Sequence, residues 1–189
     1  NNKPLWKYEN KTYNYNEIYK NDKKLVFELS KFCKKNNLNL YILPSHNKSS
    51  KYFQEEINFF NKIIKNFDQI KILNKDKVYD SYKHLNNFEI IFGLESTLMY
   101  ESLPRYKKLA FFSRFENINN YRFAWPLNEQ KRGFFFSNKI NQSEIKRIYN
   151  NLLKIPKSEW INYTKKYRKQ LMCFDYKNKQ LTKLIRNII

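Results

Sequence analysis

The chain has 189 residues, of which 41% are hydrophobic and 18% aromatic, enough for one domain with a packed core. Its 37 Lys and Arg against 17 Asp and Glu give a formal net charge of +20, which is typical of proteins that bind nucleic acid or anionic membranes. The excess is mostly Lys spread along the whole chain, with no arginine cluster and no long basic tail. We interpret it as a solvated surface that attracts anions in general.

Cysteines and histidines are too few to build a structural zinc site. The two cysteines, Cys33 and Cys173, form no pair with metal-ligand spacing, and the only histidines are His46 and His84. We expect a reducing compartment, a buried thiol at Cys33 and no metal. No apolar run approaches the roughly 20 residues that span a bilayer. We expect a cytoplasmic protein, with peripheral contact to the inner membrane surface left open.

In chain order, the first 20 residues show no clear period and predict an irregular segment anchored by Leu5, Trp6 and Tyr8. Asp22 is a candidate cap for the first helix. Short apolar runs predict strands at 38–44, 70–73, 88–93, 108–113 and 133–137. Apolar residues at helical spacing predict helices at 51–66, near 78–85, after Thr97, after a capping box at Asn141 and Glu144, at 158–171 and from 177 onward.

The alternation of strands and helices predicts an α/β fold. Strands that are apolar throughout are typical of strands buried on both faces. We therefore expect a Rossmann-like open, mostly parallel sheet with helices on both faces, plus C-terminal helices. Residues 1–189 are interpreted as a single domain, because the sequence shows no repeat, linker or composition shift.

Polar residues follow several of the predicted strands. Ligands of such sheets bind beyond the carboxyl ends of the strands. The segment 45–48, Ser-His-Asn-Lys, follows the first predicted strand; Glu95, Ser96 and Thr97 follow the third, and Arg114 follows the fourth. We expect these groups to form one anion-binding rim.

The stretch IIFGLESTLMYE, residues 90–101, is the most informative. Gly93 permits a sharp turn or the close approach of a ligand. Ser96 or Thr97 then begins a helix, where free N–H groups and a hydroxyl attract an anion. Glu101, four residues after Thr97, is placed to accept hydrogen bonds from a ribose diol. The alternative is an ordinary helix cap followed by a solvated carboxylate.

This stretch suggests a family. GLESTLMYES, followed by KKLAFF, resembles the donor-nucleotide motif in the C-terminal lobe of GT-B glycosyltransferases, such as the peptidoglycan N-acetylglucosaminyltransferase. The segments around LYILPSHNKSS and VYDSYKHL look like the corresponding parts of bacterial surface-carbohydrate biosynthesis proteins. The resemblance spans residues 22–113. The sequence departs from the pattern: a second glycine near the turn is absent, Pro104 replaces a common Gly, and no His-Pro pair follows the first strand.

The resemblance implies roles for individual residues. Ser96 and Thr97 would hold the phosphate and Glu101 the ribose. His46 stands near the position of a phosphate-contacting His, and Lys48 and Arg114 would neutralise phosphate charge. The candidate nucleotide-binding set is completed by neighbours of these residues, namely Gly93, Glu95 and Ser45.

The function that follows is the donor-nucleotide-sugar-binding domain of a bacterial glycosyltransferase in surface polysaccharide biosynthesis. The donor would be a CMP- or UDP-linked sugar, the acceptor a glycan or lipid-linked glycan, and no further cofactor is expected. A chain of 189 residues is too short for two such lobes, so we expect an acceptor lobe elsewhere that carries the catalytic base. The alternative is a basic module that binds nucleic acid or an anionic surface without catalysis. An epimerase is a third hypothesis, but the sequence shows no acid–base constellation for it.

Overall fold

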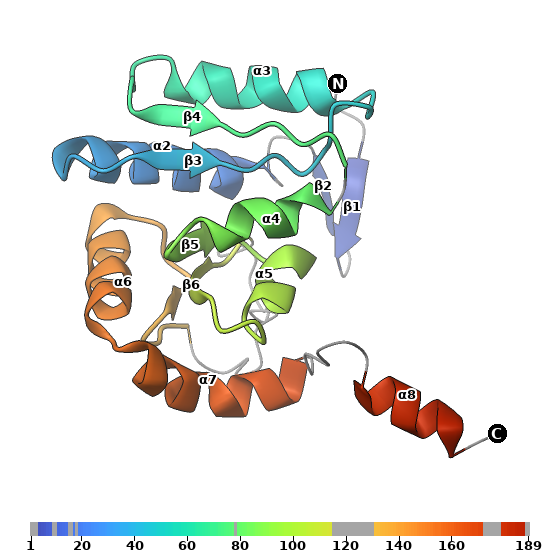
Figure 1. Ribbon diagram of the computed structural model, residues 1–189. Coiled ribbons are helices and arrows are strands. Elements are labelled where there is room, and N and C mark those ends of the chain that lie inside the picture. The colour runs from blue at the N-terminus through green and yellow to red at the C-terminus, as the bar shows by residue number, and fades with distance from the viewer. Residues whose placement is uncertain are drawn as a thin grey trace.

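The computed structural model describes residues 4–8, 11–14, 17, 19–77, 79–114, 131–171 and 179–187 (Figure 1). Two strands near the N-terminus, β1 (Pro4–Tyr8) and β2 (Lys11–Asn14), form an antiparallel hairpin. The prediction of an irregular N-terminal segment was therefore wrong. Cross-strand pairing, which places Trp6 opposite Tyr13, orders this segment although its sequence has no apolar period.

Five further strands form two parallel sheets. β3 (Leu40–Ile42) pairs with β4 (Ile70–Ile72), and β6 (Lys108–Phe112) lies between β5 (Ile90–Gly93) and β7 (Phe136–Ser137). Each strand lies inside a range that the sequence predicts. The aromatic rings of Tyr41 and Phe88 are 5.1 Å apart, and Leu40 packs against the buried side chains of both sheets. The two sheets therefore pack against each other through side chains near β3, while β3 and β5 are not hydrogen-bonded neighbours among the described strands.

Helices cover both faces of these strands. α2 (Lys20–Lys35) packs against α3 (Phe53–Ile64) and α6 (Gln142–Lys154) on one face, while α4 (Asp80–Asn86) and α5 (Thr97–Ser102) lie on the other (Figure 1). α7 (Lys157–Leu171) and α8 (Lys179–Arg186) follow. The predicted α/β fold class, with a Rossmann-like arrangement and additional C-terminal helices, is confirmed.

Aromatic side chains dominate the core. β6 is the central strand of its sheet, and its residues from Leu109 to Phe112 are fully buried. Trp160 of α7 is also fully buried, packs on Phe135, and donates its indole N–H to the carbonyl oxygen of Lys107 at 3.0 Å. Cys33 is a buried free thiol, as the sequence predicts, and burial raises its pKa to about 11.

Two helix starts test the capping predictions. Asn141 caps α6 as predicted, its side-chain oxygen accepting from the Glu144 N–H at 2.9 Å. Asp22 is not a cap, since α2 begins at Lys20 and is preceded by Tyr19 without a side-chain cap. Asp22 lies in the first turn instead. The predicted helix start at Ser158 is one residue late, because α7 begins at Lys157.

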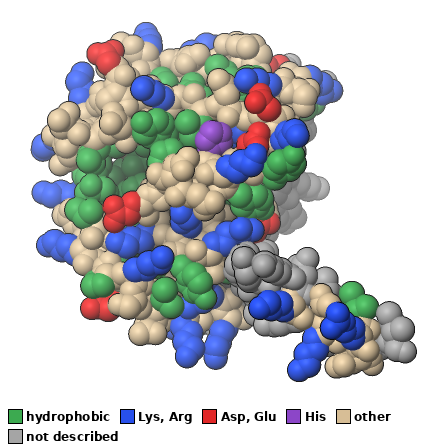
Figure 2. All heavy atoms as spheres, in the orientation of Figure 1, with side chains coloured by type: hydrophobic (Ala, Val, Ile, Leu, Met, Phe, Trp, Pro, Cys, Tyr) green, Lys and Arg blue, Asp and Glu red, His purple; other side chains and the backbone are tan. Residues whose placement is uncertain are grey.

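Lysine and arginine side chains are scattered over the face shown in Figure 2 and outnumber the acidic ones there. Within the described residues, no helix is long and apolar enough to cross a bilayer.

Candidate site at the carboxyl ends of the strands

The carboxyl ends of the two parallel sheets meet near the start of α2. Arg114 follows β6 and forms a two-point ion pair with Asp22 of α2, with N–O distances of 2.9 and 3.1 Å. The pKa of Asp22 is raised overall, mainly because the carboxyl group is buried. The Arg114 guanidinium lowers this pKa, and the nearby Glu56 carboxylate raises it further. Glu56 in turn binds the loop after β3. Rossmann-like proteins bind their ligands beyond the carboxyl ends of the strands, which is the edge where these loops lie.

The loop after β3 is held by a carboxylate. The N–H groups of Ser45 and His46 donate to the two oxygens of Glu56, at 2.7 and 2.9 Å. The His46 ring contacts Ser50 through Nδ1 at 3.3 Å. The backbone N–H groups of these two candidate residues therefore already bind an anion of the protein itself.

Lys75, in the loop after β4, lies beneath this loop. It is 4% exposed and donates from Nζ to the carbonyl oxygen of Ser45 at 2.7 Å. Burial lowers the pKa of Lys75, and the charge of Glu56 partly offsets this. Among the described residues no carboxylate forms an ion pair with Lys75. The buried ammonium and the Glu56 carboxylate therefore hold the same loop with opposite charges.

The two predicted cations are both paired. Lys48 forms an ion pair with Asp76 at 3.0 Å, with both side chains more than half exposed. Arg114 is held by Asp22 in the two-point pair described above. Phosphate binding by either cation would compete with these carboxylates.

Ser96 and Thr97 begin α5. Ser96 is the N-cap, with its Oγ accepting from the Met99 N–H at 3.3 Å, and Thr97 is the first helical residue; both side chains are exposed. Ser96 is therefore a helix cap whatever else it binds. Its hydroxyl hydrogen is not used by that bond, which leaves it available to donate.

The φ of Gly93 is not positive, so its backbone does not use the left-handed conformation that glycine favours. A Cβ atom at Gly93 would lie 2.7 Å from Sδ and 2.8 Å from Cγ of Met99. The glycine therefore makes room for the buried Met99 side chain, which packs α5 against β5.

Glu101 lies one turn into α5 and is half-buried. It accepts a hydrogen bond from the hydroxyl of Tyr82 in α4, and this bond is the main reason that the pKa of Tyr82 is raised. The guanidinium of Arg105 lies 4.6 Å from the centre of the Tyr82 ring. Glu95 accepts from the Ser113 hydroxyl at 3.4 Å and so joins the ends of β5 and β6. Thr97 and Glu101 thus lie outside the packed interior.

The family of the chain follows from sequence comparison. Residues 2–189 match the model of a family described as "putative O-antigen biosynthesis protein". The chain belongs to this family. No curated protein and no solved structure shows significant similarity to it.

Membership in the O-antigen biosynthesis family confirms the surface-carbohydrate part of the predicted function. Within the described residues, no group of three or more His, Cys, Asp or Glu side chains is arranged to hold a metal ion.

Lys75, Glu56 and the partnership of Tyr82 with Glu101 were missed by sequence reasoning. Only the fold reveals them. Lys75, for example, is one Lys in a chain that is rich in Lys, so its sequence context carries no signal of burial.

Proposed function

We propose that this chain is the donor-nucleotide-sugar-binding domain of a glycosyltransferase that acts in O-antigen biosynthesis. One observation carries the proposal. The half-buried Glu101 carboxylate stands one turn after the exposed Ser96 and Thr97, on the helix that follows the carboxyl end of β5. Family membership supports the biosynthetic context.

In this proposal the phosphate of the nucleotide lies against Ser96 and Thr97. Their hydroxyls donate hydrogen bonds to the phosphate oxygens. Because α5 has only six residues, its dipole contributes little, and side chains carry most of the interaction.

Glu101 binds the ribose in this proposal. One carboxylate oxygen accepts from Tyr82, which fixes the orientation of the group, and the other is placed to accept from a ribose hydroxyl. Sugar transfer develops negative charge on the leaving phosphate, which hydroxyls and cations at the rim would stabilise. The acceptor and the base that activates it are assigned to a second lobe, so the chain described here binds the donor.

A thermal-shift assay with a panel of nucleoside monophosphates and diphosphates tests the proposal. At a ligand concentration about 100 times Kd, binding stabilises the folded state by roughly 2.7 kcal/mol, which raises Tm by several degrees. Glu101→Ala should abolish this rise and leave the Tm without ligand near that of the wild type.

The matched control is Glu89→Ala. Glu89 precedes β5 at the opposite end of the strand, and its exposed carboxylate pairs with Lys108 at 3.4 Å. This variant should retain the full nucleotide-dependent rise in Tm. If no nucleotide raises the Tm of the wild type, the proposed function is contradicted.

A further inference from the structure

α8 combines an apolar stripe with a cationic one. Its sequence, KQLTKLIR, places Leu181, Leu184 and Ile185 at spacings of three and four residues. At 100° per residue these positions fall within about 100° of arc, and the positions of the three cations lie roughly opposite. The cations are Lys179, Lys183 and Arg186, and α8 contains no acidic residue.

The described side chains of α8 are all exposed, including Ile185 at 47%. The helix stands apart from the main body of the molecule (Figure 1), and blue basic side chains mark it in Figure 2. An exposed isoleucine opposite three cations on one helix is an arrangement that suits the boundary between lipid headgroups and acyl chains.

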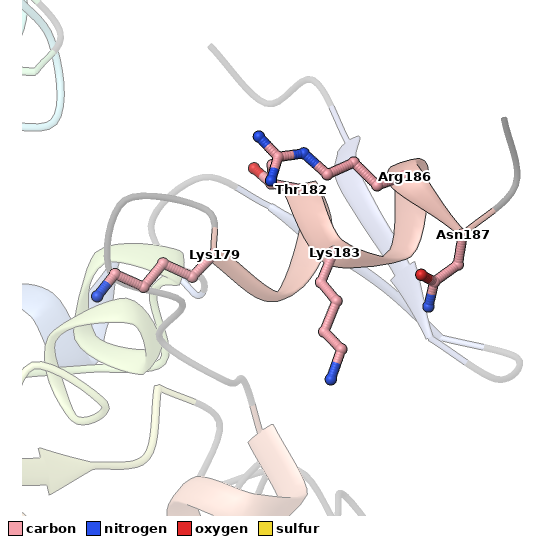
Figure 3. Close-up of a pocket in the computed structure, with 5 residues that line it drawn as sticks. All are labelled: Lys179, Thr182, Lys183, Arg186 and Asn187. Atoms are coloured by element: carbon pink, nitrogen blue, oxygen red, sulfur yellow. The ribbon is translucent and has the colours of Figure 1, made fainter.

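The cations of α8 are not arranged around a single ligand. A shallow hollow along the helix is lined by polar residues only, namely Lys179, Thr182, Lys183, Arg186 and Asn187 (Figure 3). The side chains of Lys179, Lys183 and Arg186 spread apart rather than converging on one point. Such a spread fits an extended anionic surface better than one small anion.

We propose that α8 binds the surface of a membrane that contains anionic lipids. The helix would lie in the plane of the interface, with Ile185 toward the acyl chains and the three cations among the headgroups. Charge complementarity selects this occupant, because the helix carries only positive charge and the chain has a net charge of +20. The inference is independent of nucleotide binding.

Co-sedimentation of the full chain with vesicles tests it. Vesicles of phosphatidylcholine alone are compared with vesicles that contain one third phosphatidylglycerol, at low and at physiological salt. We expect binding to the anionic vesicles that weakens with salt. Replacing Lys179, Lys183 and Arg186 with Gln should weaken binding on the order of 100-fold at low salt. Ile185→Asp should weaken it roughly ten-fold or more.

Each variant has a matched control. Replacing Lys154, Lys165 and Lys169 with Gln removes the same charge from exposed positions of α6 and α7. Leu153→Asp alters an apolar side chain of α6 that is 48% exposed, close to the value for Ile185. Both controls should bind vesicles nearly as the wild type does.

Three results would overturn the proposal. The first is equal loss of binding in the α8 variants and their controls, which would assign it to net charge. The second is a dimer in analytical ultracentrifugation that Ile185→Asp dissociates, which would make a second copy the occupant. The third is that inorganic phosphate at millimolar concentration protects α8 amides from hydrogen exchange as fully as vesicles do, which would make α8 a site for free anions.

Discussion

At the scale of single residues, Gly93 shows how packing can impose a residue type that looks functional in sequence. The space that a Cβ atom would take is filled by Met99. Gly93→Ala should therefore destabilise the protein by about 1–3 kcal/mol, because the Met99 side chain must move. In a Met99→Ala background the same substitution should cost less. Urea unfolding of the wild type, the two single variants and the double variant gives the coupling energy between the two positions. An equal cost in both backgrounds would show that backbone conformation, not packing, requires the glycine.

Glu144 makes the stability of the fold depend on acid pH. Burial opposes its ionisation, but hydrogen bonds from Arg147, Arg132 and Ser137 outweigh this and lower the pKa of Glu144 to about 2. A lowered pKa stabilises the folded state at pH values above the ordinary 4.5, and this contribution is lost as the pH falls toward 2. Its size is on the order of 3 kcal/mol.

Glu144→Gln should therefore reduce the free energy of unfolding at pH 7 by a similar amount. The difference from the wild type should shrink steadily between pH 4.5 and pH 2, as measured by urea unfolding at each pH. Glu159→Gln, at an exposed position of α7, changes the net charge equally and should show no such trend. A difference independent of pH would contradict the account of Glu144.

The residues of the candidate site differ in how readily a sequence reveals them. The roles of Asn141 and Ser96 as caps could be predicted, because a cap acts on the N–H three residues ahead. The roles of Lys75, Glu56 and Tyr82 could not, because each depends on a partner 11 to 30 residues away. The carboxylates that neutralise Lys48 and Arg114 were missed for the same reason.

At the scale of elements, two helix caps should differ in their energetic value. Asn141 caps the 13-residue α6, and its side chain accepts at 2.9 Å, whereas the bond at Ser96 on the six-residue α5 is 3.3 Å long. Asn141→Ala should cost about 1 kcal/mol, Asn141→Ser much less, and Ser96→Ala only a few tenths. Urea unfolding measures all three. A larger loss for Ser96→Ala than for Asn141→Ala would contradict this ranking.

Local patterns predict the strands and helices between residues 20 and 171 well, because each strand is a short apolar run and each helix has an apolar stripe. The N-terminal hairpin escaped prediction because antiparallel pairing depends on the partner strand. Boundaries moved by one to three residues: the start of α7 by one, and the start of α2, which has no side-chain cap, by three.

At the scale of the whole molecule, the order of strands explains why residues far apart in sequence meet at one rim. β3 and β5 end at the same edge, and the start of α2 is joined to the end of β6 through the ion pair of Asp22 with Arg114, with the Glu56 carboxylate nearby. That the 189 residues are one domain of a longer, two-lobed protein stays a prediction. The account as a whole requires that the rim near Glu101 bind a nucleotide through its ribose and phosphate.

Isothermal titration calorimetry tests this requirement most directly. The ribonucleotide that raises Tm most, and its 2′-deoxy counterpart, are titrated into the wild type and into Glu101→Gln. We predict that the wild type binds the ribonucleotide at least ten-fold more tightly, because a hydrogen bond to a charged group is worth about 1.5–3 kcal/mol, and that Glu101→Gln loses this preference. Equal affinity of the wild type for the two nucleotides, or an unchanged preference in Glu101→Gln, would contradict the role of Glu101.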